Sequence, residues 1–230
     1  YAPTVVKGSE GIIKPYSLLL FSVLTVFCFG QDLKYSTYYH HKKTLYDALP
    51  NTENEIIFLG NSITDMGSWS EIFQNPNIKN RGISGDVTEG ILYRINEITE
   101  SQPLQVFLMI GTNDLAQGLT KELTFQNICK IVKSIQSQSS KTEIIVQSIL
   151  PANSIYSLFS GHTGNTVKIK WVNGMLKDWC DDNEIIFVNL FIHLKNENDD
   201  FLNPEFTYDG LHLNGSGYQK WANVIRPLIK

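Results

Sequence analysis

The stretch LQVFLMI, residues 104–110, is an almost continuous apolar run that ends directly before Gly111. A strand that is apolar on both faces is typical of a parallel sheet covered by helices on both sides. Three other short runs are mainly apolar, at residues 55–59, 143–150 and 184–190, and residues 78–83 hold a further short strand marked by Gly82 and Gly85. These runs predict a buried sheet of five strands.

Amphipathic stretches separate the apolar runs, with apolar residues recurring at helical spacing. The predicted helices are residues 37–49, residues 87–100, a stretch around residues 125–135, a stretch around residues 167–179, and residues 217–229. Strict alternation of strand and helix implies right-handed βαβ connections and a parallel sheet between two helix layers. In such an α/β fold, the functional site lies outside the carboxyl ends of the strands.

The composition is that of a soluble globular protein. The chain has 230 residues, 42% of them hydrophobic and 18% charged, and a net charge of −4. This length suits one domain with a sizeable core, which we place at residues 31–230. The few Lys and Arg residues are scattered, so the charge pattern argues against a nucleic-acid partner.

The N-terminal residues 1–30 read as a leader outside this domain. Residues 16–29 (YSLLLFSVLTVFCF) follow Lys14 and are apolar. They are short for a membrane span, which needs roughly 20 residues, and fit a signal peptide cleaved after Gly30. We therefore expect export to the periplasm, cell surface or medium, without stable membrane insertion once the leader is removed. The alternative is an uncleaved leader that anchors the chain.

Two cysteines remain in the proposed domain, Cys129 and Cys180. Both lie in apolar helical stretches, which favours buried free thiols over a disulfide. Neither is part of a Cys/His cluster with metal-ligand spacing. We expect neither a metal nor another cofactor.

The turn FLGNSIT, residues 58–64, presents Ser62 just past the end of the first predicted strand. A serine hydroxyl at such a sharp turn is a candidate nucleophile if a base can reach it. The simpler alternative is a serine that only caps a helix. The turn is not the G-x-S-x-G elbow of α/β-hydrolases, because Thr64 stands at the last glycine position.

A carboxylate and an imidazole lie three residues apart in the loop Asp209-Gly210-Leu211-His212. Asp209 could hold His212 in the tautomer that accepts the proton of Ser62, and so complete a Ser-His-Asp triad. The alternatives are a local hydrogen-bonded turn and half of a metal site. No companion ligands accompany this pair in the sequence.

Gly85 and Asn113 are the candidate donors of an oxyanion hole, each in a loop that follows a predicted strand. A tetrahedral intermediate needs hydrogen-bond donors aimed at its negative oxygen. Gly85 lacks a Cβ, so its N–H can approach a ligand closely. The Asn113 amide and the N–H of Ser62 would be the other donors.

Four blocks of the chain together resemble the SGNH (GDSL-type) hydrolase family. They are Gly60–Thr64, Asn80–Asp86, Gly111–Asp114 and Asp209–His212, in the family's order. The resemblance implies a flavodoxin-like three-layer α/β/α sandwich, no cofactor, and ester hydrolysis. It assigns Ser62, Asp209 and His212 to the triad, and Gly85 and Asn113 to the oxyanion hole. Asn61 departs from the family, which has Asp there.

Within the family, the chain looks most like bacterial platelet-activating-factor acetylhydrolase-like proteins and carbohydrate O-acetylesterases. We expect a serine esterase that removes a small acyl group, such as O-acetyl from a carbohydrate. A lysophospholipid or platelet-activating-factor-like lipid ester is the alternative substrate, and a large exposed apolar patch beside Ser62 would favour it. A non-catalytic glycan-binding module is a further alternative. His162 could line the pocket, but a surface turn is the simpler interpretation.

Overall fold

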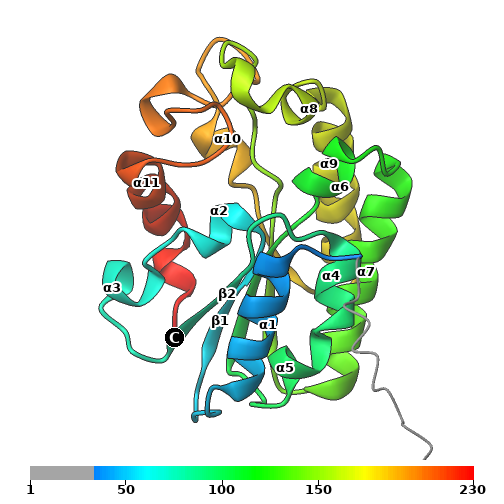
Figure 1. The fold of residues 1–230 in the computed structure, drawn as a ribbon, viewed down its shortest axis with the longest axis vertical. Coiled ribbons are helices and arrows are strands. Elements are labelled where there is room, and N and C mark those ends of the chain that lie inside the picture. Colours follow the sequence, from blue (N-terminus) through cyan, green and yellow to red (C-terminus); the bar gives the residue numbers. More distant parts are fainter. Residues whose placement is uncertain (1–33) are drawn as a thin grey trace, which may run out of the picture. The chain divides into compact units, whose positions relative to one another are not determined.

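Five parallel strands form one sheet in the computed structural model, which describes residues 34–230 (Figure 1). The strands are β1 (Ile56–Gly60), β2 (Ile78–Gly82), β3 (Gln105–Met109), β4 (Glu143–Gln147) and β5 (Ile186–Val188). Their order across the sheet is β2-β1-β3-β4-β5. This is the flavodoxin-like order. The strands remain parallel, but β2 is added on one side of β1, and β3 and the later strands are added on the other side.

Successive side chains of each central strand enter two different cores. In β3, Val106 and Leu108 pack in one hydrophobic cluster, whereas Phe107 and Met109 pack in the other. Neighbouring residues of a strand point to opposite faces of the sheet, so an unbroken apolar run fills both cores at once. The prediction of a strand buried on both faces is confirmed.

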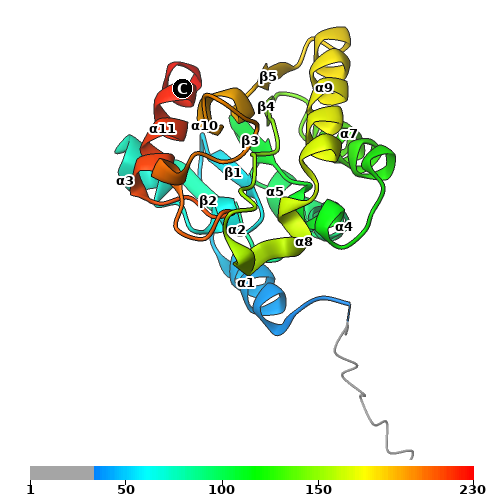
Figure 2. The ribbon, with the colours of Figure 1, turned by 90° about the horizontal axis from the view of Figure 1, so that it is seen from above.

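Helices cover both faces of the sheet (Figure 2). One face carries α4 (Thr88–Tyr93), α5 (Ile95–Thr99), α7 (Lys121–Gln138) and α9 (Thr166–Asp182). The other face carries α3 (Trp69–Phe73), α10 (Phe191–Leu194) and α11 (Gly215–Ile225). The remaining helices are α1 (Thr37–Ala48), α2 (Ser62–Asp65), α6 (Thr112–Ala116) and α8 (Ser160–Thr163), with 3₁₀ turns at Ser157–Phe159, Pro204–Phe206 and Arg226–Leu228. The predicted three-layer α/β/α sandwich is confirmed.

The single helix predicted over residues 87–100 is wrong, because the chain forms two short helices that meet at Arg94. Arg94 has φ −108° and ψ 18°, outside helical geometry. Its side chain is fully buried and donates to the carbonyl oxygen of Arg81 at 2.8 Å. The apolar spacing of the stretch therefore continues across the break between the two helices, where the charged side chain of Arg94 is buried.

Three other elements are clearly shorter than predicted. The strand expected over residues 143–150 ends at Gln147. The strand expected over residues 184–190 covers only Ile186–Val188. After it, the N–H of Phe191 donates to the hydroxyl of Ser148 and α10 begins. The helix expected over residues 217–229 ends at Ile225 and continues as a 3₁₀ turn. Pro227 lies in that turn and has no N–H to continue the helix.

Residues 34–230 form one compact unit. The predicted leader, residues 1–30, lies outside the described residues, so its cleavage and the domain boundary at residue 31 stay predictions. Within residues 34–230, no helix has both the length and the apolar character needed to cross a membrane.

Candidate active site

The first three strands end at the same level of the sheet. Gly60, the last residue of β1, is in register with Gly82 of β2 and with Met109 of β3. The loops that follow these strands therefore leave from one edge, at the point where the strand order reverses. A site built from several loops is favoured at such an edge.

Ser62 is the first residue of α2, and only Asn61 separates it from the end of β1. The side chain of Asn61 caps this helix, since its Oδ1 accepts the N–H of Ile63 at 3.1 Å. Gly60 precedes it where a Cβ would lie 2.4 Å from the carbonyl oxygen of Met109. A larger residue at position 60 would thus push the turn away from β3. Ser62 is a helix residue held in place by its neighbour, not the cap itself.

The hydroxyl of Ser62 and the Asp209–His212 loop meet across the sheet edge. Ser62 Oγ lies 2.9 Å from His212 Nε2, and His212 Nδ1 lies 2.7 Å from Asp209 Oδ2. The three groups form a continuous chain of hydrogen bonds. Such a chain can move the hydroxyl proton to the imidazole while the carboxylate orients the ring.

Backbone groups hold the carboxylate of Asp209 in this position. Its second oxygen, Oδ1, accepts the N–H groups of Leu211 at 2.8 Å and His212 at 2.7 Å. Burial alone would raise the pKa of Asp209, but the hydrogen bonds from His212 and from the two N–H groups outweigh burial and lower it. An isolated bridge between Thr207 and Leu213 closes the loop. Asp209 is therefore fixed as a carboxylate beside the ring.

Gly85 and Asn113 line the same pocket as Ser62 and His212. Gly85 has a φ of +82°, and a Cβ built there would meet nothing within 4 Å. The glycine is thus required by its backbone conformation and not by crowding. Asn113 Nδ2 donates one N–H to the carbonyl oxygen of Asp86 at 2.8 Å. Its amide carries two N–H groups, so one remains available.

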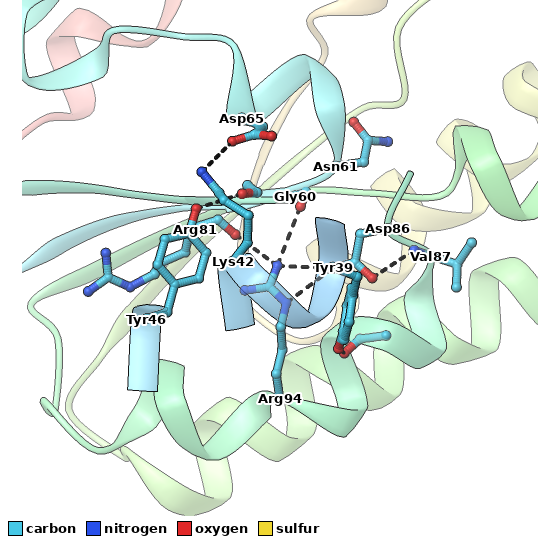
Figure 3. A network of polar contacts seen from close by, with 12 residues as sticks. Tyr39, Lys42, Tyr46, Gly60, Asn61, Asp65, Arg81, Asp86, Val87 and Arg94 are labelled. Atoms are coloured by element: carbon cyan, nitrogen blue, oxygen red, sulfur yellow. Dashed lines mark hydrogen bonds and ion pairs between the residues drawn. The ribbon is translucent and has the colours of Figure 1, made fainter. Parts of the chain in front are cut away.

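A buried ion pair supports the loop that carries Gly85 (Figure 3). Arg94 and Asp86 are 3.0 Å apart, with both side chains fully inaccessible to solvent. The guanidinium also donates to the carbonyl oxygen of Arg81, and the second oxygen of Asp86 accepts the N–H of Val87 at 2.9 Å. The residue after Gly85 is thereby fixed to the end of β2.

Asp65 links the serine helix to the glycine loop. Its Oδ2 accepts the N–H of Ser84 at 3.1 Å and the hydroxyl of Ser84 at 2.8 Å. The same carboxylate pairs with Lys42 of α1 at 2.7 Å and accepts the hydroxyl of Tyr38 (the Lys42 pair is drawn in Figure 3). The helix that begins with Ser62 and the loop that contains Gly85 are therefore held together.

The pocket above these groups has a volume of about 610 Å³. Its described lining contains no Asp, Glu, Lys or Arg side chain. Neutral polar side chains and apolar side chains share the wall: Ser84, Gln117 and Ser160 are polar, and Met66, Ala116, Leu158, Phe159 and Leu211 are apolar. Such a wall suits an uncharged substrate.

His162 also belongs to this pocket, and its interpretation as a surface turn is wrong. Its Nε2 lies 3.0 Å from Asn113 Oδ1. The contact joins residues 49 positions apart, so no local pattern could have shown it. Trp69 is buried and packs on Phe58 in the core, away from the pocket lining.

Sequence reasoning also missed Arg94, for which a pattern was present. Arg94 lies three residues after Ile91 and four before Ile98, on the apolar face that these two residues define. A charge on such a face indicates a buried partner. Within residues 34–230, no three His, Cys, Asp or Glu side chains gather to form a possible metal site.

The matches to known proteins agree with this geometry. Residues 58–220 match the model of the GDSL-like Lipase/Acylhydrolase family. The chain belongs to this family. Membership makes it a carboxylic ester hydrolase, and the resemblance drawn from the four sequence blocks is confirmed.

Similar proteins come from animals and bacteria. The Homo sapiens platelet-activating factor acetylhydrolase IB subunit alpha2 is 28% identical over 191 residues, 77% of this chain and 76% of the relative. A Streptococcus pneumonia protein named after platelet activating factor has a TM-score of 0.76 and 27% identity, covering 84% of this chain and 93% of its own. A GDSL-like lipase from Bacteroides thetaiotaomicron has a TM-score of 0.73 and 28% identity. The match covers 83% of this chain and 96% of the lipase.

Proposed function

We propose that this esterase removes a small acyl group through a covalent intermediate on Ser62. The observation that carries the proposal is the hydrogen-bonded chain from Ser62 Oγ through His212 to Asp209. A serine hydroxyl is a weak nucleophile until a base takes its proton. The base in turn needs an anion that orients it and stabilises its charged form.

In the first half-reaction, His212 Nε2 accepts the Ser62 proton as Oγ attacks the ester carbonyl carbon. The N–H of Gly85, the free N–H of Asn113 and the N–H of Ser62 stabilise the negative oxygen. Each such donor contributes about 10²–10³ in rate. His212 then gives its proton to the departing alcohol, which leaves the acyl group on Ser62.

In the second half-reaction, water gives a proton to His212 and attacks the acyl carbon. The bond to Ser62 Oγ breaks, Oγ regains a proton from His212, and the carboxylic acid leaves. A sugar hydroxyl in place of water would transfer the acyl group instead of hydrolysing it, so free acid must be measured directly.

For the substrate, we propose an O-acetyl group on a carbohydrate. The name of the 28% identical relative contains acetylhydrolase, which supports an acetyl group. Ser84, Gln117 and Ser160 offer neutral hydrogen-bonding groups along the pocket, as sugar hydroxyls require. We also propose export through the leader at residues 1–30, which would place the enzyme beside extracellular glycans. N-terminal sequencing of the protein from its host should then begin at residue 31.

A lipid ester is the second candidate, and one observation favours it. Met66 and Leu158 line the pocket and are 57% and 72% exposed. Exposed apolar side chains at a pocket mouth suit an acyl chain or another amphiphile. Replacing both by serine should lower turnover of a lysophospholipid but leave turnover of an acetylated sugar unchanged.

The decisive experiment compares p-nitrophenyl acetate, butyrate and octanoate with the full chain, Ser62→Ala and His212→Ala. We expect acetate to be preferred, with both variants folded and nearly inactive. Preference for octanoate would favour the lipid ester. Turnover that persists in Ser62→Ala would contradict the serine mechanism. Acetate release from acetylated xylan and from an acetylated phospholipid then separates the two substrate classes.

A further inference from the structure

His162 occupies a place in the pocket that the proposed mechanism does not use. It lies in α8, a helix of four residues, and reaches across the pocket lining to Asn113. We propose that His162 is a positioning residue, which holds the Asn113 amide with its free N–H turned toward the acyl oxygen. This inference rests on the proposed esterase mechanism and adds a residue to it.

The argument starts from the two ends of the Asn113 amide. Its Nδ2 donates to the carbonyl oxygen of Asp86 at 2.8 Å, and its Oδ1 lies 3.0 Å from His162 Nε2. If the amide turned over, its oxygen would face the oxygen of Asp86, and neither could donate. The two contacts therefore favour one orientation of the amide.

The contact also determines where His162 carries its proton. A side-chain amide oxygen only accepts hydrogen bonds, so His162 must donate from Nε2. In a neutral imidazole, Nδ1 then carries no proton. The structure thus implies one tautomer for this ring, which can be measured without any substrate.

The surroundings of His162 keep the ring neutral and in place. Burial, and then the charge of His212, lower its pKa below the ordinary value. The Phe159 ring packs against both histidines in T-shaped contacts, with its centroid 5.8 Å from that of His162 and 5.1 Å from that of His212. A neutral His162 does not oppose the positive charge that His212 acquires during the reaction.

Removing an oxyanion donor altogether costs about 10²–10³ in rate. Removing only the group that orients the donor should cost less, so His162→Ala should lower kcat about 10- to 100-fold with KM unchanged. His162→Gln keeps an N–H near the position of Nε2 and should recover most of the loss. A merely structural role would not depend on that N–H.

The test combines these variants with Asn113→Ala. If His162 acts through Asn113, His162→Ala should have no further effect in the Asn113→Ala background. Equal losses in both backgrounds would show that His162 acts elsewhere and would overturn the proposal. Unfolding measurements on each variant exclude loss of fold as the cause.

Two-dimensional ¹H–¹⁵N spectra of the imidazoles supply a readout that does not need activity. The His162 resonances, assigned by their absence in His162→Gln, should be those of the Nε2–H tautomer. The opposite tautomer in the wild-type protein would overturn the proposal. Absence of Ser62-dependent turnover in the wild type would contradict the proposed function instead, so the two failures are distinguishable.

Discussion

The guanidinium of Arg94 and the carboxylate of Asp86 lie 3.0 Å apart, with both side chains completely withdrawn from solvent. Burial alone would raise the pKa of Asp86, and it remains raised, to about 6, even though Arg94 counteracts the effect. The carbonyl oxygen of Asp86 accepts the amide of Asn113. The pair therefore connects the buried core to the wall of the pocket that Ser62 and His212 line.

Removing the positive partner of this pair should destabilise the fold. Arg94→Leu leaves the Asp86 carboxylate buried without its cation, which typically costs about 3–5 kcal/mol. Urea unfolding of wild type and variant measures the difference. Lys177→Ala, which removes an exposed ion pair with Asp181, is the matched control and should change stability little. Equal changes for the two variants would show that the buried pair contributes nothing special.

Gly85→Ala should lose both stability and activity. A residue with a Cβ is strained at φ +82°, at a cost of about 1–2 kcal/mol. Gly118→Ala is a matched control, because Gly118 has φ +89° and equally open space around a Cβ. Both variants should unfold more easily, but only Gly85→Ala should have a reduced kcat. A comparable kcat loss in Gly118→Ala would count against a special role for Gly85.

Asn61→Ala should weaken the helix that begins with Ser62. Loss of the cap costs about 0.5–2 kcal/mol, and kcat should fall because the serine loses its support. Asn61→Asp keeps the accepting oxygen and should retain the cap. Thr120→Ala removes the corresponding cap of α7 and should cost similar stability with kcat intact. If kcat remains normal in Asn61→Ala, the cap does not position the nucleophile.

Asp209→Asn should reduce kcat by about 10⁴ if Asp209 orients His212, because the amide favours the wrong tautomer of the ring. The lowered pKa of Asp209 means that the native carboxylate is still ionised where an ordinary aspartate, with a pKa of about 3.9, is half protonated. Steady-state kinetics at neutral pH measure the loss. Near-normal kcat would assign the orienting role to another group.

His162 should make the fold less stable in mild acid. Its folded-state pKa is lowered by burial and by His212, so the unfolded chain takes up the proton first as the pH falls. The free energy of unfolding should therefore decline as the pH falls from about 6.5, the pKa in the unfolded chain, to the lowered pKa of the folded state. Well above pH 6.5, His162 should not affect the free energy of unfolding. His162→Gln should lose less stability than wild type between about pH 7.5 and about pH 5.5 in urea unfolding. Parallel declines would contradict the lowered pKa.

Long regular elements could be predicted from the sequence because their burial is periodic. The run LQVFLMI at residues 104–110 contains all of β3 and exceeds it by one residue at each end. The four-residue helix that starts at Ser62 has too few turns to show a period. The break at Arg94 also depends on a partner outside its own helical stretch, because the arginine donates to the carbonyl oxygen of Arg81 in β2.

The residues of the candidate site also fall into those that a local sequence pattern indicates and those that it does not. Ser62, Asp209 and His212 could be proposed because each lies in a recognisable local pattern, and the parallel sheet predicts that loops after neighbouring strands converge. His162 lies in the short helix α8, and Asn113 is 49 positions away in the sequence, so their contact has no local pattern. Residues that support a site through long-range contacts are the ones that sequence patterns miss.

The hydrogen bond between Ser62 and His212 joins positions 150 residues apart. A ribosome releases the chain from its N-terminal side, so the proposed nucleophile emerges well before the proposed base. A nascent chain that already contains Ser62 and most of the sheet still lacks the imidazole and its carboxylate. If the triad acts as proposed, the chain gains its esterase activity only after the last part of the sequence has been synthesised.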